Sequence, residues 1–122
     1  MNIVEKPWGS YIDYFRDADC VFKIMTIKPG QSMSYQVHKE RNEVWVVSNG
    51  TASIKTSVYG DDSALTNYMM SELEEGEFIL IQNESAHQIA NNGDDDLIIY
   101  EMQFGNCSEE DIIRLHDPHN RQ

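Results

Sequence analysis

Short apolar runs separated by turn residues recur along most of the chain. Because such runs are about as long as strands, and Gly, Pro, Asn and Asp separate them, they predict a β-sandwich or β-barrel. No alternation of strands with helical periods is present, which argues against a βαβ fold. The expected strands are residues 21–27, 32–38, 43–47, 52–58, 77–81, 87–90 and 97–104.

Three connections have local signals of their own. Asn49-Gly50 between two β-rich runs favours a tight hairpin turn with positive φ. Ser108 before "EEDIIRL" predicts a capped, short C-terminal helix with acidic residues in its first turn. The run "NNGDDD", residues 91–96, indicates a solvated loop, with a calcium site as the less favoured alternative.

Length and charge limit the possible functions. The 122 residues suit one domain, 1–122, and the net charge of -12 argues against nucleic acid or an anionic membrane as partner. A phosphate-bearing ligand therefore requires a local basic cluster that overrides the overall field. Two distant cysteines predict free thiols, and the absence of a signal sequence or long apolar run predicts a cytoplasmic protein.

Polar residues gather around His38 in an otherwise apolar strand pattern. Gln36 and His38 are two apart and share one strand face, and Glu43 follows after a short turn. With His87 from a later strand, these side chains can converge on one metal ion. The alternative is that each is an ordinary hydrogen-bonded residue of the barrel interior.

The spacing of these residues resembles the two sequence motifs of the cupin superfamily. The first motif reads Gly30, Gln36-Val37-His38, Glu43 and Gly50, and the second reads Gly76, Gln82-Asn83-Glu84, His87 and Asn91. The chain departs from the motifs at two places, because Gln36 stands where the first His is usual and "QNE" stands for Pro-x-Gly. The resemblance implies a double-stranded β-helix (jelly-roll) barrel with Gln36, His38, Glu43 and His87 as metal ligands.

Within cupins the chain resembles the cupin domain of type II mannose-6-phosphate isomerases, which carry Gln-x-His at this point. The matching stretches are "KPWGSY", "TIKPGQSMSYQVH", Arg41-x-Glu43-x-Trp45 and "EEDIIRLHD". The departures are Lys39-Glu40 in place of a His-rich stretch, Gln88 in place of a basic residue, and "PHNRQ" at the end. The nucleotidyltransferase domain often fused to this cupin is absent from the sequence, so guanylyltransferase activity is not expected.

The resemblance implies a metal-dependent aldose–ketose isomerase acting on a sugar or sugar phosphate. Arg114 matches a family Arg and is the expected catalytic cation. The candidate base is either Glu101 or a metal-bound hydroxide. Lys23 and Lys28 are the candidates for binding phosphate. Zinc, manganese, iron, cobalt and nickel all suit such a nitrogen and oxygen donor set.

Two other functions stay open, and so does the assembly. A non-catalytic metal- or carbohydrate-binding cupin fits the acidic charge and the missing basic residues, and an iron-dependent oxygenase is disfavoured by Gln36. A homodimer is expected from the cupin resemblance and from the need to cover open sheet edges.

Overall fold

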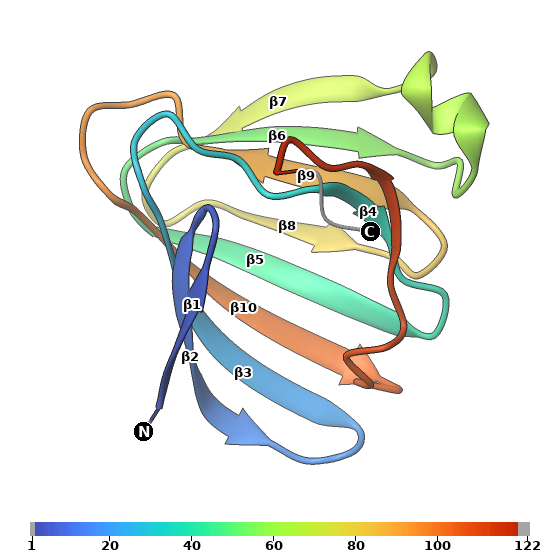
Figure 1. The fold of residues 1–122 in the computed structure, drawn as a ribbon, viewed down its shortest axis with the longest axis horizontal. Coiled ribbons are helices and arrows are strands. Elements are labelled where there is room, and N and C mark those ends of the chain that lie inside the picture. The colour runs from blue at the N-terminus through green and yellow to red at the C-terminus, as the bar shows by residue number, and fades with distance from the viewer. Residues whose placement is uncertain (1, 120–122) are drawn as a thin grey trace.

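The computed structural model describes residues 2–119, which form two antiparallel sheets (Figure 1). The larger sheet has the order β1-β2-β3-β10-β5-β8 and the smaller has the order β11-β4-β9-β6-β7. The strands of the larger sheet are β1 (Ile3–Lys6), β2 (Gly9–Arg16), β3 (Cys20–Ile27), β10 (Leu97–Gly105), β5 (Arg41–Asn49) and β8 (Phe78–Ile81). Those of the smaller sheet are β11 (Ile113–His116), β4 (Tyr35–Val37), β9 (Ala86–Ala90), β6 (Ala52–Ser57) and β7 (Met69–Leu73).

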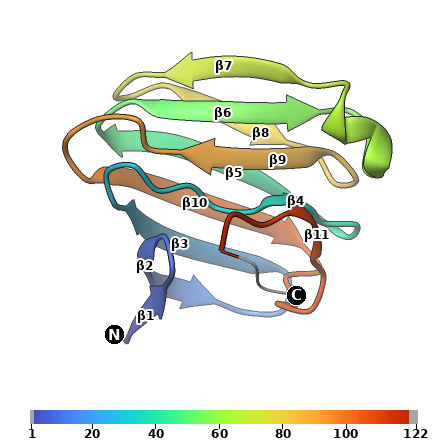
Figure 2. The same ribbon diagram turned by 45° about the horizontal axis from the view of Figure 1, so that its top comes forward.

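The two sheets face each other, and the smaller sheet lies in front of the larger one in Figure 2. Alternation in β3 turns Val21, Met25 and Ile27 inward, and alternation in β5 does the same for Trp45 and Val47. Met25, Ile27, Trp45 and Val47 meet residues of β6 and β9 to form the main apolar core. The expected all-β double-stranded β-helix is therefore confirmed, and each expected strand region contains a strand.

The expected hairpin at Asn49-Gly50 is wrong. Gly50 has the anticipated positive φ, +90°, but β5 and β6 belong to different sheets. Both edges of β5 are already paired, one with β10 and the other with β8, so β6 has no free edge to join. The glycine therefore carries the chain from one sheet to the other.

The expected C-terminal helix after Ser108 is also wrong. The Ser108 hydroxyl accepts from the Glu110 amide, as a cap does, but the chain turns only once and then enters β11. Strand β11 pairs with β4, so its backbone groups find partners in the sheet instead of in a helix. The one helical element among residues 2–119 is a short 3-10 helix, Asp62–Leu65, which the sequence patterns did not indicate.

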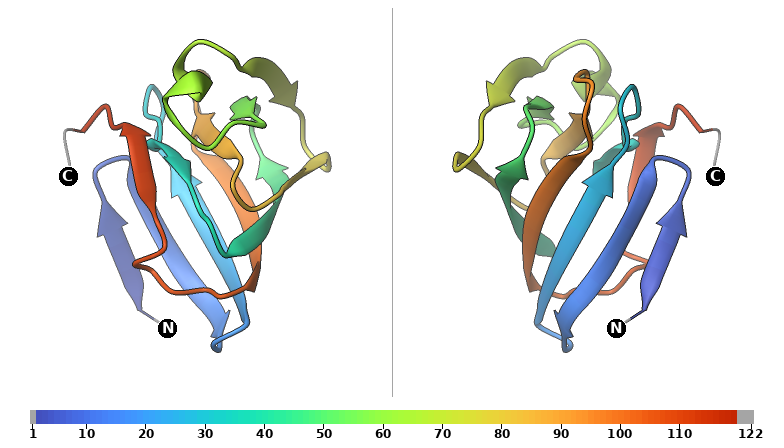
Figure 3. Two further views of the ribbon diagram at one scale, coloured as in Figure 1. Left: turned by 90° about the vertical axis from the view of Figure 1, so that its right-hand side faces the viewer. Right: turned by 90° about the vertical axis from the view of Figure 1, so that its left-hand side faces the viewer.

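The edges of the barrel matter for the site. Residues of β1, β2 and β11 line one cavity, and Figure 3 shows these strands on the side of the molecule opposite β7. Strands β1, β2 and β11 thereby frame one end of the space between the sheets. No helix among the described residues is long and apolar enough to cross a membrane.

Candidate metal centre

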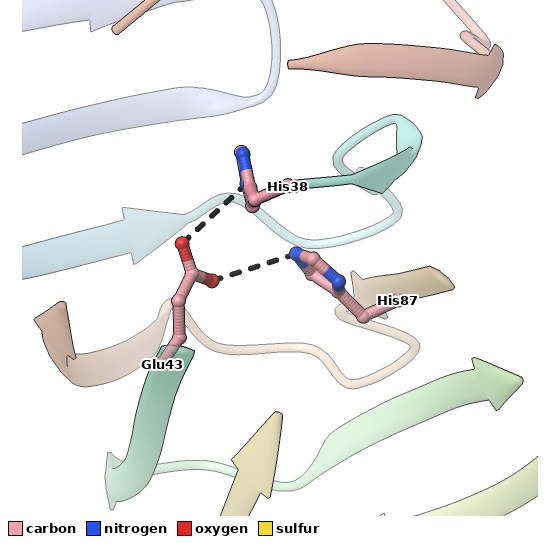
Figure 4. A group of neighbouring side chains, drawn as sticks. All are labelled: His38, Glu43 and His87. Atoms are coloured by element: carbon pink, nitrogen blue, oxygen red, sulfur yellow. Dashed lines mark ion pairs between the residues drawn. The ribbon is translucent and has the colours of Figure 1, made fainter. Parts of the chain in front are cut away.

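Three of the expected ligands meet in the barrel interior. His38 directly follows β4, Glu43 is near the start of β5, and His87 is in β9, where it pairs with Gln36 of β4 (Figure 4). All three side chains are at most 3% exposed. The two sheets therefore bring together residues that are more than forty positions apart in the chain.

Glu43 lies between the two imidazoles. One carboxylate oxygen, Oε2, is 3.5 Å from His38 Nε2, and the other, Oε1, is 3.5 Å from His87 Nε2. One donor atom from each of the three residues lies within 4.8 Å of the others. This spacing matches three ligands around one ion, each at about 2 Å from it.

The backbone sets the protonation of both imidazoles. His38 Nδ1 contacts the carbonyl oxygen of Asp111, and His87 Nδ1 lies 3.0 Å from the carbonyl oxygen of Ser85. Since a carbonyl only accepts hydrogen bonds, each Nδ1 carries the proton and each neutral ring has its lone pair on Nε2. Both lone pairs therefore face Glu43, which is how metal-binding histidines are commonly oriented.

Two buried atoms in this cluster lack hydrogen-bond partners. They are Glu43 Oε1 and His87 Nε2, whose separation of 3.5 Å is longer than a normal hydrogen bond. A buried carboxylate oxygen and a buried lone pair without a donor are costly, and a cation between them satisfies both. The donor set and its orphaned atoms therefore fit a divalent metal.

Arg41 is a further member of this site, to which the sequence patterns assigned no role. Its Nε donates to Glu43 Oε2 at 2.8 Å, and its Nη2 lies 3.0 Å from His38 Nε2. Arg41 and Glu43 are two apart on β5 and share its inward face, so strand alternation was the signal that could have found it. A metal bound to the His38 lone pair requires this guanidinium to move aside.

Burial and charge shape the ionisation of the cluster. Burial lowers the pKa of His38 to about 4, although the neighbouring Glu43 carboxylate opposes the shift. Burial raises the pKa of Glu43, but His87, His38 and Arg41 outweigh it and hold that pKa well below its usual range. Glu43 is thus a carboxylate and His38 is neutral at pH 7, which are the forms that bind metal.

A cavity of about 190 Å³ at the end framed by β1, β2 and β11 reaches His38, whereas Glu43 and His87 do not line it. Four of the nine basic residues of the chain line it, namely Lys6, Lys23, Arg41 and Arg114. Glu101 and Glu109 are its only lining carboxylates among the described residues. A locally basic cavity thus exists in a protein of net charge -12.

The structure brings most of the predicted site residues to this cavity. Gln36, Lys23, Glu101 and Arg114 all line it, and Arg114 pairs with Gln36 between β11 and β4. Arg114 also has a buried Nε without a hydrogen-bond partner. Lys28 is different, because it is exposed in the turn after β3 and is not part of the cavity lining.

Glu101 and Lys23 have defined partners. Glu101 accepts hydrogen bonds from Trp45 Nε1 at 2.8 Å and from Gln103 Nε2 at 2.6 Å. Burial raises the pKa of the Glu101 carboxyl, and the nearby Glu43 raises it further. The Lys23 amine lies 4.2 Å from the centre of the Tyr11 ring and 3.2 Å from Glu109 Oε1.

Three residues that depart from the isomerase pattern, Lys39, Glu40 and Gln88, lie outside the cavity lining, and residues 120–122 of the departing "PHNRQ" lie outside the described residues. Lys39 and Glu40 are exposed, and their backbone amides donate to the Asp111 carboxylate at 3.0 Å and 2.9 Å. Gln88 turns away from His87 along β9 and donates to the carbonyl oxygen of Met33. These replacements therefore alter the rim and the outside of the barrel more than the metal cluster.

The sheets and the buried cluster define a cupin barrel with a candidate metal centre. Residues 2–117 match the family described as "Mannose-6-phosphate isomerase C-terminal", and the chain belongs to that family. It is 36% identical over 119 residues to the alginate biosynthesis protein AlgA of Pseudomonas aeruginosa and 34% identical to a mannose-1-phosphate guanylyltransferase of Escherichia coli. Each match covers 97% of this chain but only 23% of the relative, so the chain spans less than a quarter of their length.

Solved structures agree with this fold. The capsular polysaccharide assembling protein CapF of Staphylococcus aureus superposes with a TM-score of 0.81 at 20% identity, over 94% of this chain and 32% of CapF. A Klebsiella pneumoniae protein with a double-stranded β-helix domain gives a TM-score of 0.69 at 18% identity, over 85% of this chain and 78% of its own. At these identities the likeness concerns the fold alone.

Proposed function

We propose that the protein is a metal-dependent sugar-phosphate isomerase that interconverts an aldose and a ketose, with mannose 6-phosphate and fructose 6-phosphate as the pair. The observation that carries this proposal is the concentration of basic side chains around the cavity above His38, Glu43 and His87. An acidic protein would otherwise repel a phosphate. The sugar-phosphate relatives point to the same substrate class.

His38, Glu43 and His87 would hold the metal, and Gln36 would supply a fourth donor from the same cavity. A bound divalent ion would polarise the sugar carbonyl and its neighbouring hydroxyl as a Lewis acid. Zinc, manganese, iron, cobalt and nickel all accept such a mixed set of nitrogen and oxygen ligands.

The other cavity residues have distinct roles in this proposal. The Lys23 amine and the unpaired Nε of Arg114 attract the phosphate and the developing oxyanion. Glu101 moves the proton between the two adjacent sugar carbons, and its raised pKa makes it a stronger base than an ordinary carboxylate. Trp45 and Gln103 hold its carboxylate in place through their hydrogen bonds.

The test measures both the metal content of the protein and its turnover of sugar phosphates. The purified protein is analysed for bound metal, and interconversion of mannose 6-phosphate and fructose 6-phosphate is followed with and without chelator. We expect bound metal, chelator-sensitive turnover, and loss of both in His87→Ala. His116→Ala is the matched control, because His116 is in β11 and does not line the cavity. Bound metal without turnover on any sugar phosphate would overturn the isomerase, and metal retained in His87→Ala would overturn the site.

A second candidate is a carbohydrate-binding domain without turnover. The position of Arg41 favours it, because its guanidinium compensates the Glu43 carboxylate without any metal. In that case sugar or sugar phosphate binds, chelator leaves its affinity unchanged, and no interconversion occurs. Calorimetric titration of mannose 6-phosphate with and without chelator separates the two candidates.

A further inference from the structure

Glu109 lies in the segment that connects β10 to β11, and its carboxylate contacts two cations of the larger sheet. One carboxylate oxygen, Oε1, is 2.6 Å from Arg16 Nη2 and 3.2 Å from Lys23 Nζ. Arg16 is the last residue of β2 and Lys23 is in β3, so the two cations come from neighbouring strands. A single anionic oxygen thus bridges an arginine and a lysine, which are the side chains that bind phosphate oxygens in proteins.

Both cations are also held by contacts that do not involve Glu109. The Lys23 side chain is only 7% exposed, and its amine lies 4.2 Å from the centre of the Tyr11 ring. The Arg16 guanidinium donates through Nε to the Asp13 carboxylate at 2.9 Å, which leaves its Nη edge for Glu109. If the Glu109 carboxylate leaves, the two positive groups therefore stay anchored close together.

The charges of this cluster balance only while Glu109 is in place. Lys23 and Arg16 are opposed by the carboxylates of Asp13 and Glu109, so the cluster as it stands is neutral. Without the Glu109 carboxylate one positive charge is uncompensated, and it can attract an anion to a chain of net charge -12. Lys23 and Glu109 line the cavity that reaches His38, so this cluster belongs to one wall of that cavity.

The Glu109 carboxylate can leave while the backbone around it stays in place. The Cys107 amide donates to the carbonyl oxygen of Ala18 in the β2–β3 turn, and the Asp111 carboxylate accepts from two backbone amides. The chain is thus anchored on both sides of Glu109. The Glu109 side chain itself is 54% exposed, so its rotation into solvent frees the two cations without moving either anchor.

We propose that Lys23 and Arg16 form the subsite for the phosphate group of the substrate, and that Glu109 occupies this subsite until a phosphate displaces it. The inference rests on the proposed function for the identity of the sugar. A carboxylate attached to the chain competes with ligands at an effective concentration that is about millimolar for a short flexible connection. A phosphate brings close to two negative charges and three acceptor oxygens, so it displaces the carboxylate better than a monoanion does. Glu109 thereby selects phosphate esters over weaker anions.

The test is a titration with inorganic phosphate, followed by NMR of the backbone amides, with chelator present so that no metal ion binds the phosphate. We expect Glu109→Gln to bind inorganic phosphate about tenfold more tightly than the wild type, because the competing carboxylate is gone. Glu110→Gln is the matched control, since it removes the same charge from the next residue, which is exposed, and it leaves the affinity nearly unchanged. Arg16→Gln in the Glu109→Gln background removes the gain, because the subsite then lacks one of its two cations.

Folding of each variant is checked by circular dichroism and thermal melting. Equal affinities of the wild type and folded Glu109→Gln would overturn the inference. An equal gain in Glu110→Gln, or a gain that survives Arg16→Gln, would overturn it as well. The isomerase is tested separately by chelator-sensitive turnover. A protein that shows the gain in Glu109→Gln but no turnover of sugar phosphates would support the phosphate subsite and overturn the isomerase.

Discussion

Arg41 and Glu43 are joined side chain to side chain in the barrel interior. Arg41 Nε and Nη2 both lie 2.8 Å from Glu43 Oε2, and both residues are at most 6% exposed. The same Nη2 is 3.0 Å from His38 Nε2, where a metal would bind. The positive charge of the guanidinium therefore takes the place next to Glu43 that a metal ion needs.

Arg41→Met is expected to tighten metal binding about tenfold or more. The substitution removes both the competing donor on His38 and a positive charge close to the ion, while it keeps an unbranched side chain of similar length. Titration calorimetry with zinc or manganese measures the affinity. Lys6→Met is the comparison, because it removes another positive charge from the cavity lining. It is expected to change the metal affinity less than Arg41→Met does. Equal or weaker binding by Arg41→Met would show that Arg41 does not compete.

Without metal, the same Arg41→Met variant is expected to lose stability. The Glu43 carboxylate is then buried without its cation, and breaking a buried pair costs about 3–5 kcal/mol. Added metal replaces the missing charge, so the metal-induced rise in Tm is larger than in the wild type. Melting curves with chelator and with excess metal measure both effects.

Replacing the cavity cations is expected to weaken binding of a sugar phosphate. Lys23→Gln and Arg114→Gln each raise KM for mannose 6-phosphate about tenfold to a hundredfold, since each removes a charged partner of the phosphate. Lys28→Gln is the control with an equal loss of charge, because Lys28 is exposed and does not line the cavity. If Lys28→Gln raised KM as much, the overall charge and not the cavity would govern binding.

The convergence of the candidate ligands could be predicted because it depends on local periodicity and spacing. Alternation puts Gln36 and His38 on one side of a strand, and the motif spacing selects Glu43 and His87. The same alternation applies to Arg41, but a buried arginine is uncommon, so the pattern alone did not assign it to the interior. Its burial follows from the central place of β5 in the larger sheet, between β10 and β8, which only the fold supplies.

The two errors have a common physical cause. Asn49-Gly50 has the sequence of a turn, and Gly50 does adopt a positive φ. Ser108 has the sequence of a helix cap, and its hydroxyl does accept a hydrogen bond from the Glu110 amide. The structure that follows each of these residues depends on which distant strands have a free edge for pairing. Strand β6 finds partners in β7 and β9, and residues 113–116 find one in β4. Short-range propensity does not contain that information.

Asp111 is expected to support the metal centre through the backbone. Its carboxylate accepts hydrogen bonds from the backbone amides of Lys39 and Glu40. Its backbone carbonyl accepts a hydrogen bond from His38 Nδ1. Asp111→Ala removes the acceptor of two exposed amides and is expected to cost about 0.5–1.5 kcal/mol. Chemical denaturation measures the loss, and metal affinity is expected to fall with it. Glu110→Ala, one residue earlier and exposed, is expected to change neither quantity.

The Glu109 carboxylate is expected to make stability depend on pH. Burial raises its pKa, but Lys23 and Arg16 outweigh burial and lower the net value, with Arg16 Nη2 only 2.6 Å away. A carboxyl whose pKa is lower in the folded state contributes stability above its unfolded pKa, about 4.3, and loses that contribution as pH falls through the folded value. Glu109→Gln should therefore be less stable than wild type at pH 7.

The difference between the two proteins should shrink as pH falls below about 4, because the wild-type carboxyl then becomes protonated and neutral like the amide. Urea denaturation of both proteins across this pH range gives the difference directly. Glu110→Gln is the matched control, because it changes the same formal charge one residue along the chain. A Glu109→Gln difference that stays constant from pH 7 to pH 3 would mean that the ion pairs with Lys23 and Arg16 do not stabilise the fold.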